Sequence, residues 1–111
     1  MKDWRITKSK VKAAVKRIIE VSRPRRVFLF GSYVQGTQNI NSDVDILVVV
    51  GDTIANCRKE GVRIRKALGD ISMPMDILVV RYRDFKKLAH IPGLIYETIV
   101  KEGKVVYEAA A

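Results

Sequence analysis

Two aspartates at alternate positions, Asp43 and Asp45, stand just before a run of apolar residues that ends at Val50. Strands expose alternate side chains on the same face, so the spacing predicts that both carboxylates point the same way, one pleat apart. Carboxylates held this close repel each other and do not stabilise a fold alone. Because oxygen ligands suit Mg²⁺, the pair predicts a divalent metal site.

A second feature, Gly31-Ser32, follows the short apolar run at residues 26–30. A backbone turn there offers N–H groups and a hydroxyl to an anion. Carboxylates for a metal beside donors for phosphate predict a nucleotide site. A third acid, Asp76, begins the sequence Asp-Ile-Leu-Val-Val, which repeats the letters that begin at Asp45. If the two strands are neighbours, three carboxylates converge, and without metal their repulsion should make them retain protons.

The pattern of Gly31-Ser32, ten residues and then Asp43-x-Asp45 resembles the signature of the DNA polymerase β-like nucleotidyltransferase superfamily. In length the chain is similar to its minimal nucleotidyltransferases (MNT), which are usually encoded beside a small helical HEPN protein. The resemblance covers nearly the whole chain. It implies an α/β (α+β) fold, in which helices pack on a small mixed β-sheet.

The same resemblance implies a role for each matching residue. Gly31 lets the backbone approach the triphosphate, and Ser32 donates to its β and γ phosphates. Asp43, Asp45 and Asp76 hold one or two Mg²⁺ ions, with ATP as the substrate. Asp76 also helps to deprotonate the acceptor hydroxyl, which attacks the α-phosphorus and releases pyrophosphate.

The implied function is transfer of AMP to a tyrosine of a HEPN-type helical partner, a toxin whose antitoxin is the nucleotidyltransferase. A different class of function stays open, in which a non-catalytic antitoxin neutralises its partner by occlusion. The sequence supports this alternative because Tyr33-Val34-Gln35 follow Ser32, where many relatives carry a basic residue. Arg26 or Arg81 could replace that cation. Nucleotide addition to RNA is a third and weaker hypothesis, suggested only by positive charge.

Composition limits the classes of protein that fit. The 111 residues, 48% of them hydrophobic, predict one domain over residues 1–111 with a modest core. We find no apolar stretch long enough for a membrane span and no secretory signal. A single cysteine, Cys57, excludes an internal disulfide and fits a cytoplasmic protein. Cys57 is interpreted as a helical core residue and the single histidine, His90, as a helix-end residue, neither of them a metal ligand. The oligomeric state, homomeric or with a partner, stays open.

The net charge of +9 is concentrated at one end of the chain. Most of the excess lies in residues 1–26, where the only acids are Asp3 and Glu20. Two interpretations stay open: a solvated helix face, or a surface for an acidic partner, which could be protein or nucleic acid. The basic residues of this segment are Lys2, Arg5, Lys8, Lys10, Lys12, Lys16, Arg17, Arg23, Arg25 and Arg26.

Apolar periodicity and turn residues predict the elements that position these groups. We expect a first helix over residues 9–22, capped by Ser9 and stopped by Pro24. A loop with Asn39 and Asn41 among its turn residues should join the first two strands. Gly61 lies in the second helix, where close approach to the sheet would explain it. The other expected elements are strands at 26–30, 43–50 and 75–81, helices at about 53–68, 82–90 and 92–101, and an edge strand at 104–107.

Overall fold

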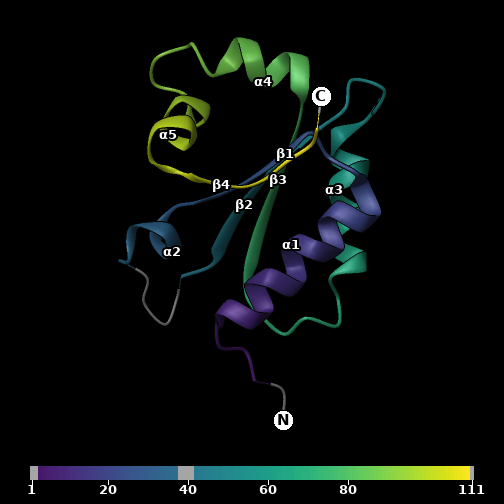
Figure 1. The fold of residues 1–111 in the computed structure, drawn as a ribbon, viewed down its shortest axis with the longest axis vertical. Helices are drawn as coiled ribbons and strands as arrows, with labels where there is room; N and C mark the ends of the chain where they lie inside the picture. Colours follow the sequence, from purple (N-terminus) through teal and green to yellow (C-terminus); the bar gives the residue numbers. More distant parts are fainter. Residues whose placement is uncertain (1–2, 38–41, 111) are drawn as a thin grey trace.

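The computed structural model describes residues 3–37 and 42–110. Its four-stranded sheet has the order β3-β2-β1-β4, with β1 antiparallel to both neighbours and β2 parallel to β3 (Figure 1). The expected small mixed sheet with packed helices is therefore confirmed. The elements are α1 (Lys8–Ser22), β1 (Arg26–Phe30), α2 (Ser32–Gln35), β2 (Val44–Val50), α3 (Cys57–Ala67), β3 (Met75–Arg81), α4 (Tyr82–Leu88), α5 (Ile95–Glu102) and β4 (Lys104–Glu108).

Helices cover both faces of the sheet (Figure 1). Helices α1 and α3 lie on one face, where Ile18 and Ile64 pack against Ile46 and Val48 of β2. Helices α4 and α5 lie on the other, where Phe85 and Ile99 pack with Leu47. Strand β2 is central and buried almost throughout, as its β-branched composition predicts. Alternate residues of this strand thus enter two different cores.

The first helix starts earlier than expected. Thr7, and not Ser9, is the N-cap: its side chain accepts a hydrogen bond from the backbone N–H of Lys10. The helix ends at Ser22, and the left-handed backbone of its C-cap, Arg23 (φ 46°), turns the chain before Pro24. The expected stop is confirmed, but the cap was misassigned. Both residues are good caps, so the apolar pattern alone did not fix the first turn.

The other helices are shorter than predicted. Helix α3 begins at Cys57 and not near residue 53, because Asn56 caps it through a hydrogen bond from the N–H of Lys59. Pro92 does not open a helix: a turn through Gly93 (φ 88°) follows it, and α5 begins at Ile95.

For the segment between β1 and β2 the turn residues predict only a loop. In the structure this segment begins with a short helix, α2, directly after Gly31. The turn residues Asn39 and Asn41 lie outside the described residues. In the part of the chain that the structure describes, no helix is long and apolar enough to cross a membrane.

Candidate active site

Asp45 lies second in the central strand β2, between Phe30 of β1 and Asp76 of β3. The five repeated letters explain this placement: the segments that begin at Asp45 and Asp76 pair residue by residue in the parallel ladder. Strand alternation puts both carboxylates on the face of Leu47, which is the face of α4 and α5. The two strands are therefore neighbours, which is the condition under which the acids were expected to converge.

The carboxylate of Asp45 is crowded by other acids. Partial burial raises the pKa of Asp45 above its usual value, and the negative charges of Asp76 and then Asp43 raise it further. Asp43 itself is exposed and directly precedes β2. All three acids therefore lie at the same end of the sheet, and the charges of the other two act on Asp45. Such crowding favours either a bound proton or a cation.

Gly31 lies directly against Asp45. Its backbone has φ 77° and ψ −157°, a conformation that is essentially restricted to glycine. A Cβ atom at this position would overlap the carboxylate of Asp45 and stand 3.2 Å from its Cγ. The turn and the carboxylate are therefore in contact, as the sequence predicts. Ser32 follows as the first residue of α2 and is partly buried.

Asp76 has a cationic neighbour that the sequence did not reveal. Arg65 belongs to α3, on the opposite face, and reaches the edge strand β3, where its guanidinium donates to the carbonyl oxygen of Ile77 at 2.9 Å. The same Nη2 atom lies 4.0 Å from Oδ1 of Asp76. Both side chains are more than half exposed, so this ion pair is weak. No spacing rule links positions 65 and 76, because the contact depends on the packing of α3.

The three carboxylates do not form a ready-made cage. Among residues 3–37 and 42–110, no three acidic, histidine or cysteine side chains stand close enough together to hold a metal ion as they are placed. The strands bring Asp45 and Asp76 side by side, whereas the side chain of Asp76 is 68% exposed. The donor chemistry itself, carboxylate oxygen, suits Mg²⁺.

Neither arginine named as a replacement cation lies near the acids. Arg26 pairs with Val49 and Arg81 with Val50, at the opposite end of β2 from Asp45. Arg26 lies 3.7 Å from Glu108, and Arg81 donates to Asp84 at 3.1 Å. That hypothesis was therefore wrong. Among the ion pairs of the described residues, only that of Arg65 involves one of the three acids.

This mixed sheet, with acids at one end of the neighbouring strands β2 and β3 and a glycine turn against Asp45, is the architecture of a nucleotidyltransferase domain. A family model described as Polymerase beta, Nucleotidyltransferase matches residues 12–111. The chain therefore belongs to this family of nucleotidyltransferase enzymes, which confirms the expected superfamily.

Known relatives point to one branch of the family. Over 30 residues, the chain is 60% identical to the protein adenylyltransferase MntA of Shewanella oneidensis. This match spans 27% of the chain and only 22% of that relative's length.

Solved structures show the same fold. A toxin–antitoxin crystal structure with AMP-PNP is similar with TM-score 0.55 and 25% identity, over 88% of this chain and 73% of that chain. A mutant of the MntA–HpeT toxin–antitoxin gives TM-score 0.52 and 25% identity, over 95% and 75% of the two chains. A Sulfolobus solfataricus protein, provisionally described as a nucleotidyltransferase, gives TM-score 0.55 over 93% and 90% of the chains, but at 18% identity it supports the fold alone.

Proposed function

We propose that this protein transfers AMP from ATP, with Mg²⁺, to a hydroxyl of a helical partner protein of the HEPN type, and thereby acts as the antitoxin of that partner in the cytoplasm. The observation that carries the proposal is the register of β2 and β3, which puts Asp45 beside Asp76 with Gly31 against Asp45. The similarity to MntA-type proteins supports the choice of AMP and of a protein acceptor.

The residues take separate roles in this proposal. Asp43, Asp45 and Asp76 would hold Mg²⁺, which when bound neutralises charge on the triphosphate. Gly31, which has no side chain to block access, leaves its backbone open to the phosphates, and Ser32 donates a hydrogen bond to them. Asp76, which is more exposed than its strand partner Asp45, accepts the proton of the acceptor hydroxyl.

The reaction balances as a substitution at the α-phosphorus. The acceptor oxygen forms a bond to this phosphorus, the bond to the β-phosphate bridging oxygen breaks, and pyrophosphate leaves. The acceptor proton moves to a carboxylate. The protein contributes mainly the positioning of the reactants and a fixed charge environment.

The direct test uses α-labelled ATP, Mg²⁺ and a purified HEPN-type partner. We expect label on the partner with the natural protein, and none with the Asp43→Asn, Asp45→Asn double variant. The matched control is Asp52→Asn, Asp70→Asn, which removes two exposed carboxylates elsewhere. Asparagine at 52 and at 70 keeps the oxygens that accept from the N–H of Arg83 and from the guanidinium of Arg17, so the control should fold. Equal labelling by the two double variants would refute catalysis at Asp43 and Asp45.

A non-catalytic antitoxin is the second candidate, and one observation favours it. Arg26 and Arg81 lie at the far end of β2, so neither replaces the basic residue that many relatives carry after Gly-Ser. Growth of cells that express the toxin separates the candidates: protection by the Asp43→Asn, Asp45→Asn variant would indicate occlusion. RNA as the acceptor is the third candidate, and label on added RNA instead of protein would support it.

A further inference from the structure

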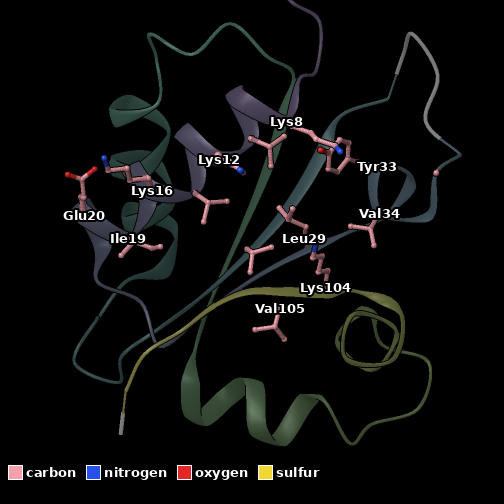
Figure 2. A pocket seen from close by; sticks show the side chains of 14 residues that line it. Lys8, Lys12, Lys16, Ile19, Glu20, Leu29, Tyr33, Val34, Lys104 and Val105 are labelled. Carbon is pink, nitrogen blue, oxygen red and sulfur yellow. The ribbon is translucent and has the colours of Figure 1, made fainter.

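A groove of about 1070 Å³ lies between α1 and strands β1 and β4 (Figure 2). It is on the face of the sheet that α1 and α3 share (Figure 1). Its floor is aliphatic and comes from elements far apart in sequence. The apolar lining residues are Val11, Val15, Ile19, Leu29, Val34, Val105 and Val106, with one aromatic residue, Tyr33.

Lysines border this apolar floor. Lys8, Lys12 and Lys16 extend from α1 at intervals of four residues, about 6 Å of helix axis each, and Lys104 lies across the groove from them (Figure 2). All four are exposed, and Glu20 is the one acid among the lining residues. The rim is therefore strongly positive.

These lysines differ from their basic neighbours. The ammonium group of Lys10 donates to three backbone carbonyl oxygens, and Arg17 forms an ion pair with Asp70 at 2.8 Å. By contrast, within residues 3–37 and 42–110 the groove lysines make no hydrogen bond or ion pair. Lys10 and Arg17 are thus engaged within the protein, and the lysine row on α1 is left for a partner.

We propose that the groove docks an acidic amphipathic helix of the partner protein. An apolar stripe of such a helix fits the aliphatic floor, and Glu or Asp residues beside the stripe, one helical turn apart, match the spacing of Lys8, Lys12 and Lys16. This inference extends the proposed function by naming the surface that recognises the partner, and it depends on that function only for the partner's identity.

Other occupants fit the groove less well. Proteins that bind single-stranded RNA stack its bases on aromatic side chains, whereas this floor has aliphatic residues and only Tyr33 as an aromatic. A second copy that met the same groove through a two-fold axis would bring the two lysine rows together, and their charges would repel. Charge and apolar lining together therefore favour an acidic helix.

The probe is a synthetic helical peptide about four turns long, with leucines on one stripe and glutamates at four-residue intervals beside it. We expect saturable binding to the full chain, measured by fluorescence anisotropy without nucleotide. Lys8→Glu, Lys12→Glu, Lys16→Glu should weaken this binding by about tenfold or more, and a peptide with lysines in place of the glutamates should then bind the variant. Ile19→Ser should weaken binding of either peptide and leave its salt dependence unchanged.

The control variant is Arg58→Glu, Lys59→Glu, Lys87→Glu, which makes the same change in net charge outside the groove. It should bind the peptide like the natural chain. Circular dichroism is used to check that each variant folds. Equal weakening by the control, no rescue by the charge-swapped peptide, or preferential binding of an oligoadenylate RNA would overturn the proposal. So would sedimentation that shows an oligomer which only the groove variant dissociates. Because no nucleotide is present, the Asp43→Asn, Asp45→Asn variant should still bind the peptide, so failure of docking and failure of AMP transfer are distinguishable.

Discussion

The Cα atom of Gly31 lies against the carboxylate of Asp45, so closely that a Cβ atom at position 31 would overlap the carboxylate oxygen Oδ2. The two residues are 14 positions apart and come together because Phe30 pairs with Asp45 across β1 and β2. Two features require glycine at position 31: the close contact with Asp45 and the positive φ. The end of β1 and the proposed metal-binding acid are therefore in direct contact.

Gly31→Ala should lower the free energy of unfolding and abolish nucleotide binding. Gly36→Ala is the matched control, because Gly36 also has a positive φ of 74° but nothing within 4 Å of its added Cβ. We expect about 1 kcal/mol of destabilisation at Gly36 and clearly more at Gly31. Urea unfolding measures both. In an Asp45→Ala background part of the Gly31 effect should vanish, and an unchanged effect would show that backbone strain alone is responsible.

Arg65→Gln should strengthen Mg²⁺ binding. The substitution removes the positive charge 4.0 Å from Asp76 but keeps a donor for the carbonyl of Ile77. Because the pair is exposed, the gain should be modest, up to about fivefold in the dissociation constant, with little change in stability. Isothermal titration with Mg²⁺ and a non-hydrolysable ATP analogue measures it. Weaker binding of the analogue would instead show that Arg65 contacts the triphosphate. Arg58→Gln, an exposed arginine of the same helix, is the control.

The acid positions could be predicted from sequence because they depend on local rules. Alternation in a strand relates Asp43 to Asp45, and the repeated Asp-Ile-Leu-Val-Val indicated that two strands begin alike. The parallel register that pairs Asp45 with Asp76 was a hypothesis, since the repeat fixes neither direction nor order of strands. Once the strands pair, the letters align without a shift. The predicted residue ranges of the first three strands agree closely with those of β1, β2 and β3 in the structure.

What could not be predicted depends on tertiary packing. The approach of Arg65 to Asp76 requires α3 to lie along the edge strand, and the distance of Arg26 and Arg81 from the acids follows from the register of β2. The helix starts differ from the prediction for another reason: threonine, serine and asparagine are all good N-caps, and the apolar pattern does not choose between neighbouring candidates.

Glu60 should make stability depend on pH in the acid range. It is a buried acid of α3, only 7% exposed, and Ser22 of α1 donates to it at 2.6 Å. The hydrogen bonds from the Arg63 guanidinium are the main reason that the pKa of Glu60 is lowered below 4.5, and Ser22 adds to this. A lowered folded pKa means that the stabilisation is fully present above the unfolded pKa and is lost as pH falls through the folded pKa.

Glu60→Gln should therefore lower the free energy of unfolding by about 1–3 kcal/mol at pH 7. The difference from the natural chain should shrink as pH falls through the lowered folded pKa of Glu60, where its carboxylate becomes protonated. Urea unfolding at several pH values measures it. Glu102→Gln is the control at an exposed acid and should show no such trend. A difference that stays constant down to pH 2 would contradict a role for the ionised carboxylate.

Gly61→Ala should stabilise the protein, which corrects the expectation that close approach to the sheet demands glycine there. A Cβ atom at Gly61 would meet Cγ2 of Val79 at 3.6 Å, an ordinary van der Waals contact. Since glycine inside a helix costs about 0.5–1 kcal/mol relative to alanine, the substitution should raise the free energy of unfolding by up to this amount. Gly103→Ala is the informative contrast, because its Cβ would stand 2.5 Å from the carbonyl oxygen of Ile99 and 3.0 Å from that of Leu29. Thermal unfolding of both variants should therefore show shifts of opposite sign, and a loss of stability at Gly61 would mean that α3 packs against β3 more tightly than this contact allows.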